Sequence, residues 1–393
     1  MKILITSDWY APTINGVVVS MLSLKQSLER QGHEVRVLTL SHSPHSYRHD
    51  GVTYIGSFNA GRIYPNARIR LAPARPLLQD LVDWQPDIVH SQCEFCTFFL
   101  ARKIAEACDA PFVHTYHTIY EDYTHYFSPS ERLGRRTMAA FAYWVGTQID
   151  CYVAPTEKIR TLLENYGVKC PVCIIPTGLD LSALSAPVTP EKRDEMRRKL
   201  GIPKDQLVLA AIGRLAEEKN TEELISYMAA CRGLPVTMLL VGDGPNRPAL
   251  EAQVKKLGLQ KNVLFTGMVP HEDVGLYYHL GDIFVNASTS EAQGLTYIEA
   301  LAAGLPALCR ADEALDGVIE SGVNGWQYHD EAEFRARLEQ FAADAGLQKR
   351  MSDAAAVSAA AYSSDTFGQR AEALYQERLR LASNFRRRST LAS

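Results

Sequence analysis

The chain has 393 residues, of which 46% are hydrophobic and 22% are charged, and its formal net charge is −4. This length is too great for one hydrophobic core and predicts two domains. No apolar stretch reaches the roughly 18 residues that a membrane-spanning helix needs, so we expect neither an integral membrane protein nor a secretory signal before the first strand.

Charge is distributed unevenly. Residues 1–178 carry a formal charge of +1, residues 179–365 carry −9 and residues 366–393 carry +4. Residues 51–79 contain no acidic residue and four arginines: Arg62, Arg68, Arg70 and Arg75. Arginines interleaved with apolar side chains fit an anionic membrane surface, and a solvated loop is the alternative interpretation. No nucleic-acid partner is expected, and the oligomeric state stays open.

Eight cysteines include two Cys-x-x-Cys pairs, Cys93 with Cys96 and Cys170 with Cys173. The distance between the pairs does not fit a zinc ribbon. We expect reduced, partly buried thiols, although the spacing leaves a redox role open for the first pair.

The first half of the chain alternates apolar strands with helical segments. Strands are predicted at residues 2–7, 34–40, 52–56, 88–91, 112–116 and 151–154. Helices are predicted at residues 17–31, 77–84, 95–107, 131–149 and 157–166. This alternation predicts an α/β domain with a doubly wound parallel sheet.

A Ser/Ala/Pro-rich stretch, residues 181–190, is predicted to be an interdomain linker. A second alternation follows, with strands at residues 207–213, 236–242, 263–267, 282–287 and 306–309. A helix over residues 366–383 is expected to cross back to the first domain. We therefore predict two Rossmann-like domains facing across a cleft, residues 1–178 with 366–393 and residues 179–365. No Gly-x-Gly-x-x-Gly fingerprint follows either first strand, which disfavours an NAD-dependent dehydrogenase.

Two carboxylates eight positions apart, Glu291 and Glu299, flank Gly294 directly after a predicted strand. This pattern predicts a strand end, a glycine-containing loop and a helix N-terminus, whose unpaired N–H groups attract anions. One carboxylate could bind the hydroxyls of a sugar and the other those of a ribose.

Arg214 and Lys219 follow the first strand of the second domain, at the sheet edge where ligands bind. Both could clamp a diphosphate. A ligand whose phosphates bind to these cations and whose hydroxyls bind to the two carboxylates would be a nucleotide sugar. No Asp-x-Asp pair is present, so the sequence does not require a divalent metal.

The first domain offers His117 at a strand end facing the predicted cleft, whereas His114, on the opposite face, is expected to be structural. Gly16, in the loop after the first strand, would let the backbone approach a phosphate. The aromatic run 116–127, with Tyr120 and Tyr126, could receive an acyl-bearing acceptor at a membrane interface. Core packing of a loop is the alternative.

Together, residues 12–16, His117, residues 213–219, residues 241–245 and the glutamate pair resemble the retaining glycosyltransferases of family 4. These enzymes have two Rossmann-like domains in the GT-B arrangement, and the resemblance covers nearly the whole chain. The stretch 117–126 further resembles the bacterial diacylglycerol α-glucosyltransferases, which sit on the inner membrane face.

The resemblance implies that Glu291 and His117 act at the donor sugar and that the second domain binds the donor. The residues that it implies for the nucleotide sugar are Gly16, Arg214, Lys219, Gln293, Gly294, Leu295 and Glu299. Catalysis would be front-face substitution, in which the leaving diphosphate helps to deprotonate the acceptor and electrostatic stabilisation dominates.

The function expected from these resemblances is transfer of a hexose, glucose from UDP-glucose, to diacylglycerol by a cytoplasmic enzyme peripheral to the inner face of the plasma membrane. The first domain would bind the acceptor, and no tightly bound cofactor is expected. The predicted acceptor and membrane contacts are Arg62, Arg68, Arg70, Arg75, Tyr120 and Tyr126. The alternatives are a soluble or polyprenyl-linked saccharide acceptor, and a nucleotide-sugar-binding protein without turnover.

Overall fold

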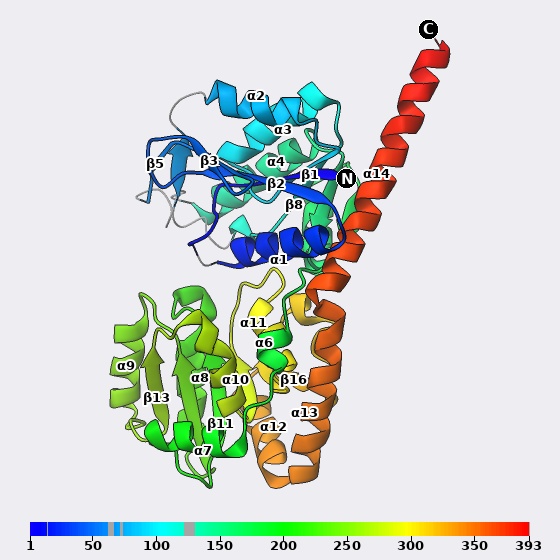
Figure 1. Ribbon diagram of the computed structural model, residues 1–393. Coiled ribbons are helices and arrows are strands. Elements are labelled where there is room, and N and C mark those ends of the chain that lie inside the picture. Colours follow the sequence, from blue (N-terminus) through cyan, green and yellow to red (C-terminus); the bar gives the residue numbers. More distant parts are fainter. Residues whose placement is uncertain (14, 62–66, 71–73, 122–129, 393) are drawn as a thin grey trace. The chain divides into compact units, whose positions relative to one another are not determined.

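A computed structural model describes residues 1–393 with the exception of residues 14, 62–66, 71–73, 122–129 and 393 (Figure 1). The chain divides into two compact units. Unit 1 consists of Met1–Leu179 and Ser364–Ser393, and unit 2 of Asp180–Ser363. Both units are α/β structures built around a sheet of mainly parallel strands, which confirms the predicted fold class.

The sheet of unit 1 has the strand order β10-β9-β8-β7-β1-β2-β4-β3. Its strands pair in parallel, apart from β3, which is antiparallel to β4. The strands are β1 (Lys2–Ser7), β2 (Glu34–Leu40), β3 (Tyr47–His49), β4 (Val52–Ile55), β7 (Ile88–Ser91), β8 (Phe112–Thr115), β9 (Cys151–Ala154) and β10 (Val172–Ile174). Strand order reverses between β1 and β7, and α/β sheets bind ligands beside the carboxyl ends of strands at such a switch point.

Helices cover both faces of this sheet (Figure 1). Side chains of α1 and α14 share one buried cluster with the strands, while α2 and α3 lie on the opposite face. The helices of unit 1 are α1 (Gly16–Arg30), α2 (Arg75–Asp83), α3 (Cys96–Cys108), α4 (Glu131–Gly146), α5 (Glu157–Asn165) and α14 (Ser364–Ala392). A separate hairpin pairs β5 (Ser57–Asn59) with β6 (Arg68–Arg70).

The sheet of unit 2 is parallel, in the order β13-β12-β11-β14-β15-β16. Its strands are β11 (Leu207–Ile212), β12 (Val236–Val241), β13 (Val263–Gly267), β14 (Ile283–Asn286), β15 (Ala307–Arg310) and β16 (Gly325–Tyr328). Its helices are α6 (Ser182–Ser185), α7 (Pro190–Lys199), α8 (Thr221–Ala230), α9 (Arg247–Lys256), α10 (Val274–Leu280), α11 (Leu295–Ala302), α12 (Glu331–Ala343) and α13 (Ala345–Ala359). The switch point lies between β11 and β14.

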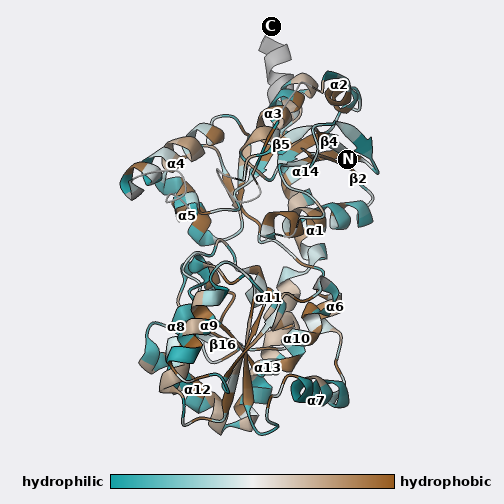
Figure 2. Ribbon diagram, turned by 90° about the vertical axis from the view of Figure 1, so that its left-hand side faces the viewer, coloured by the Kyte–Doolittle hydropathy of each residue, from teal (hydrophilic) through white to brown (hydrophobic). Residues whose placement is uncertain are grey.

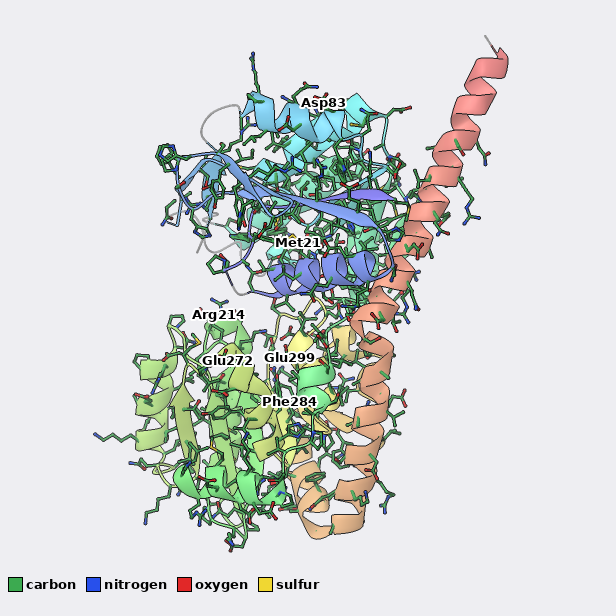
Figure 3. All side chains as sticks on the ribbon, viewed as in Figure 1. Met21, Asp83, Arg214, Glu272, Phe284 and Glu299 are labelled. Atoms are coloured by element: carbon green, nitrogen blue, oxygen red, sulfur yellow. The ribbon has the colours of Figure 1, made fainter. Side chains whose placement is uncertain are left out.

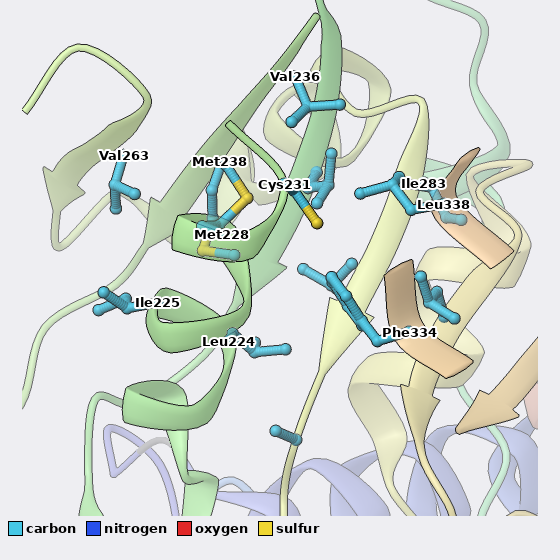
Figure 4. Packing of buried hydrophobic residues seen from close by; sticks show 14 of the residues in the cluster. Leu224, Ile225, Met228, Cys231, Val236, Met238, Val263, Ile283, Phe334 and Leu338 are labelled. Carbon is cyan, nitrogen blue, oxygen red and sulfur yellow. The ribbon is translucent and has the colours of Figure 1, made fainter. Parts of the chain in front are cut away.

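The core of unit 2 explains why its strands have uninterrupted apolar sequences. All six residues of β12 are buried. Met238 and Leu240 pack with side chains of α8, α9 and α12 (Figure 4), whereas Leu239 and Val241 pack with those of α7 and α10. A strand covered on both faces needs apolar residues at every position, and each such side chain contributes about 1.5–3 kcal/mol. In Figure 2 the strands of this sheet are hydrophobic and α7 is hydrophilic.

Several elements differ from the sequence predictions. The predicted linker contains the short helix α6, and the C-terminal helix α14 begins earlier and ends later than expected. The elements that were not predicted include β10, β16 and α7. The two strands have only three and four residues, too few for a periodic pattern to stand out.

Candidate active site

The donor-site residues predicted in unit 2 gather at its switch point. Arg214 follows β11 and Glu291 follows β14, and these two strands are hydrogen-bonded neighbours. In Figure 3, Arg214 and Glu299 lie at the edge of unit 2 formed by the carboxyl ends of the strands. Residues far apart in the sequence are therefore brought together where an α/β sheet binds its ligand.

An ion pair connects the two sides of this switch point. Lys219 Nζ donates to Glu291 Oε1 at 2.7 Å, and the Glu291 side chain is 9% exposed against 30% for Lys219. Arg214 pairs with Glu218, whose side chain is the more buried of the two. Both cations predicted to bind a diphosphate thus already have carboxylate partners, and an arriving anion would compete with these carboxylates for them.

Two glycines hold the Arg214 loop in place. A Cβ atom on Gly242 would lie 2.0 Å from the carbonyl oxygen of Gly213, and one on Gly244 would lie 2.2 Å from that of Leu215. The Leu215 N–H also donates to the Asp243 carbonyl at 3.0 Å. The glycines after β12 are therefore needed for close backbone packing, which fixes the course of the loop that carries Arg214.

Helix α11 begins at Leu295, directly after its N-cap residue Gly294, and the sequence pattern predicts a helix start at this glycine. Gly294 has a φ of 77°, a left-handed conformation, and a Cβ atom there would lie 2.6 Å from Tyr297 Cδ2. Both facts favour glycine. The first turn of α11, starting at Leu295, follows Glu291 and the buried Gln293 directly, so a carboxylate and a helix N-terminus are neighbours.

Glu299 has a partner that the sequence did not reveal. Its Oε2 accepts a hydrogen bond of 2.7 Å from the hydroxyl of Tyr278, a fully buried residue of α10. Burial, and secondarily the Glu299 charge, hold the pKa of Tyr278 well above its usual value. Tyr278 therefore stays protonated and fixes the orientation of the half-buried Glu299 carboxylate.

In unit 1, Gly16 is the first residue of α1, where a loop position was expected. The preceding Asn15 caps the helix, because its Oδ1 accepts from the Val18 N–H at 2.9 Å. Gly16 is exposed and follows β1, the strand beside the switch point of this sheet.

His117 and Gln92 meet beyond the ends of the neighbouring strands β8 and β7. His117 Nε2 lies 2.7 Å from Gln92 Oε1. Burial lowers the pKa of His117 to about 4; the nearby Glu94 opposes this shift and His114 adds to it. His117 is therefore a neutral imidazole at pH 7. Gln92 was not among the predicted site residues, because a lone glutamine gives no sequence signal.

A buried carboxylate, Glu94, lies next to this pair. Its Oε2 accepts from the Tyr120 hydroxyl at 2.5 Å, and its Oε1 lies 3.2 Å from His114 Nε2. Burial and the Glu94 charge raise the pKa of Tyr120 well above its usual value. His114 is fully buried, with ring contacts to Phe98 and other aromatic side chains. Tyr120 thus bonds to a carboxylate inside unit 1.

The arginines predicted to face a membrane have different environments. Arg68 Nε donates to Ser57 Oγ at 2.6 Å and to the Ser41 carbonyl at 2.9 Å, so its guanidinium stabilises the β5–β6 hairpin, and the membrane contact predicted for it stays a prediction. Arg70 is half-buried and Arg75 is exposed. Arg62 and Tyr126 lie outside the described residues.

Among the described residues, no group of His, Cys, Asp and Glu side chains is suited to hold a metal ion. Within the same residues, no helix combines the length and apolarity needed to cross a membrane. All eight cysteines are free thiols.

Comparison with known families gives two matches that together span most of the chain. Residues 14–183 match "Glycosyltransferase Family 4" and residues 192–357 match "Glycosyl transferases group 1". The alpha-monoglucosyldiacylglycerol synthase of Streptococcus pneumoniae is 32% identical over 98% of this chain and 88% of its own length. The enzyme of the same name from Acholeplasma laidlawii is 31% identical over 95% of this chain and 96% of its own.

Solved structures show the same fold at lower identity. Anabaena HepE in complex with UDP-glucose has a TM-score of 0.73 and 19% identity, over 96% of this chain and 100% of its own. Sucrose-phosphate synthase from Thermosynechococcus elongatus has a TM-score of 0.73 and 20% identity, over 96% of this chain and 98% of its own. These similarities support the GT-B class of fold.

Proposed function

Because this chain belongs to the family 4 glycosyltransferases, we propose that it transfers glucose from UDP-glucose to a hydroxyl of diacylglycerol with retention of the anomeric configuration. The main observation in support of donor binding is the Lys219–Glu291 ion pair at the switch point of unit 2. This pair supports the proposal because a cation suited to a phosphate lies beside a carboxylate suited to sugar hydroxyls. The comparison structure with bound UDP-glucose has the same fold.

In the proposed reaction, the bond between the anomeric carbon and the diphosphate oxygen breaks. The acceptor oxygen forms its bond on the same face of the sugar, and the acceptor proton passes to the departing diphosphate. Arg214 and Lys219 stabilise the charge that develops on the diphosphate, and Glu291 holds the sugar while its ring becomes cationic. Glu299, oriented by Tyr278, binds the ribose, and Gly16 approaches a phosphate.

Unit 1 supplies the acceptor side in this proposal. The names of the two synthases indicate glucosylated diacylglycerol as the product class. Helix α4 of unit 1 also exposes three arginines together with apolar side chains, of which Leu133 is 58% exposed and Tyr143 44%. The exposed arginines are Arg132, Arg135 and Arg136.

A surface of this composition suits an anionic bilayer, because each basic residue near such a membrane contributes about 1 kcal/mol while apolar side chains insert among the lipids. We infer peripheral attachment to the inner face of the plasma membrane, with α4 at the lipid surface. The exposed Arg75 remains a candidate contact.

The test is a transfer assay that crosses a panel of UDP- and GDP-hexoses with diacylglycerol vesicles, polyprenyl-linked saccharides and soluble saccharides. We expect radiolabel in a lipid product from UDP-glucose, with an α-anomeric linkage by NMR. Transfer to a saccharide but not to diacylglycerol would refute the lipid acceptor. Tight donor binding without transfer or hydrolysis would refute an enzymatic role.

A further inference from the structure

Gln92 is held in a defined position beside His117. It follows β7 directly, its backbone N–H donates to the Thr6 carbonyl of β1 at 2.8 Å, and it is 1% exposed. Strand β7 pairs with β8, with Ser91 opposite His114, so the chain just beyond β8 approaches Gln92. The glutamine is thus fixed by the sheet, and His117 approaches it from the next strand.

The hydrogen bond between these side chains determines the position of a proton. With Oε1 of the Gln92 amide facing the ring, this oxygen only accepts, so in that orientation a neutral His117 carries its proton on Nε2, 2.7 Å away. Its other nitrogen, Nδ1, then has a free lone pair. Nδ1 has no hydrogen-bond partner among the described residues, and His117 is only partly buried.

Within the part of the chain that the structure describes, the neighbouring titratable groups have other partners. Glu94 Oε2 accepts from Tyr120 and its Oε1 lies 3.2 Å from His114 Nε2, and His90 is hydrogen-bonded through both nitrogens, to the Tyr375 hydroxyl at 2.6 Å and to Thr115 Oγ1 at 2.7 Å. Burial, as the largest cause, lowers the pKa of His90 well below its usual value as well. His90 therefore favours the neutral form, as His117 does.

We propose that Gln92 is a positioning residue that fixes His117 as the Nε2–H tautomer, so that Nδ1 accepts a hydrogen bond from a hydroxyl group of the sugar donor. This inference rests on the proposed function, in which His117 contacts the sugar. The recognised group must be one that donates, since a bare imidazole nitrogen cannot bind a carbonyl, a fluorine or an unprotonated phosphate oxygen.

The first experiment observes the tautomer without any substrate. In full-length protein labelled with ¹⁵N-histidine, long-range ¹H–¹⁵N spectra distinguish protonated from bare ring nitrogens. The protein has 11 histidines, and the His117 signals are those absent from a His117→Gln variant. We expect a bare Nδ1 at pH 7 in the wild type and a mixture of tautomers in Gln92→Met. A protonated Nδ1 in the wild type, or unchanged signals in Gln92→Met, would overturn the proposal.

The second experiment measures the hydrogen bond to substrate. In a set of UDP-glucose analogues, fluorine replaces one sugar hydroxyl at a time, which removes the donor and keeps an acceptor. We expect one analogue to lower kcat/KM roughly tenfold beyond its inductive effect in the wild type, and this specific loss to disappear in Gln92→Met. The inductive effect is common to both enzymes and cancels in the comparison.

Gln148→Met is the matched control, because Gln148 bonds to Arg102 elsewhere in unit 1 and its loss should leave the His117 signals and the analogue ranking unchanged. Equal analogue penalties in wild type and Gln92→Met would refute the hydroxyl contact. If UDP-glucose were not a donor, the transfer assay would fail while the spectra still decided the tautomer, so the two failures are distinguishable.

Discussion

Replacing Glu291 with glutamine removes one charge from the Lys219–Glu291 pair and keeps its shape. The amide oxygen of the new side chain can still accept from Lys219, so the structure predicts a modest loss of stability, about 1 kcal/mol. The effect on catalysis should be larger. A charge-assisted hydrogen bond to a sugar hydroxyl contributes about 1.5–3 kcal/mol, so kcat/KM should fall roughly 10- to 150-fold.

Three measurements on one preparation separate these effects: urea unfolding, UDP binding by calorimetry and initial rates with UDP-glucose. We expect UDP affinity to change little, since Glu291 is assigned to the sugar, while the rate falls. Glu251→Gln is the matched control, because Glu251 pairs with Arg247 on an exposed helix surface. A Glu291→Gln enzyme with more than half of the wild-type kcat/KM would refute the assignment of this carboxylate to the sugar.

Four further predictions follow from the same structure. Gly294→Ala should destabilise the protein by about 3 kcal/mol in urea unfolding, through left-handed strain and overlap with a ring; a loss below about 1 kcal/mol would contradict the packing described. Glu218→Gln should lower the KM for UDP-glucose a few-fold, because the half-exposed Arg214 loses a competing carboxylate; an unchanged KM would count against that competition. The pKa of His117 is lowered from 6.5 to about 4 on folding, so the unfolded chain binds its proton first and stability should fall as pH drops from about 6.5 to about 4. His117→Gln should make this fall shallower, and parallel pH profiles would argue against a neutral, partly buried ring. Arg135→Glu with Arg136→Glu should weaken co-sedimentation with anionic vesicles roughly tenfold or more at low salt, without changing affinity for UDP; unaltered sedimentation would remove α4 from the membrane surface.

The local structure around Glu291 and Glu299 was predictable because its sequence signal is local. Glu291, Gly294 and Glu299 lie within nine consecutive residues, and a strand end, a left-handed glycine and a helix start are features of neighbouring backbone. The parallel α/β class alone was enough to predict that Arg214 lies at the carboxyl end of the first strand of unit 2. The apolar run of β12 likewise predicted a strand covered on both faces.

Side-chain partners were not predictable in this way. Gln92 bonds to His117, Tyr278 to Glu299 and Arg68 to Ser57, and each pair joins separate elements of the chain. Which elements become neighbours depends on strand order and helix packing, and which atoms meet depends on the rotamers that the packing allows. The pattern of residues alone leaves both open.

The sequence by itself therefore determined the class of fold, the edge of the second sheet at which Arg214 and Glu291 lie and the glycosyltransferase family, because apolar periodicity and short motifs act over a few residues. Only the tertiary structure decided that Arg68 bonds to Ser41 and Ser57, that Tyr120 bonds to the buried Glu94 and that His117 Nε2 lies within hydrogen-bond distance of Gln92 Oε1. Those outcomes are set by burial and by hydrogen bonds between distant segments, and such contacts exist only once the sheet has formed.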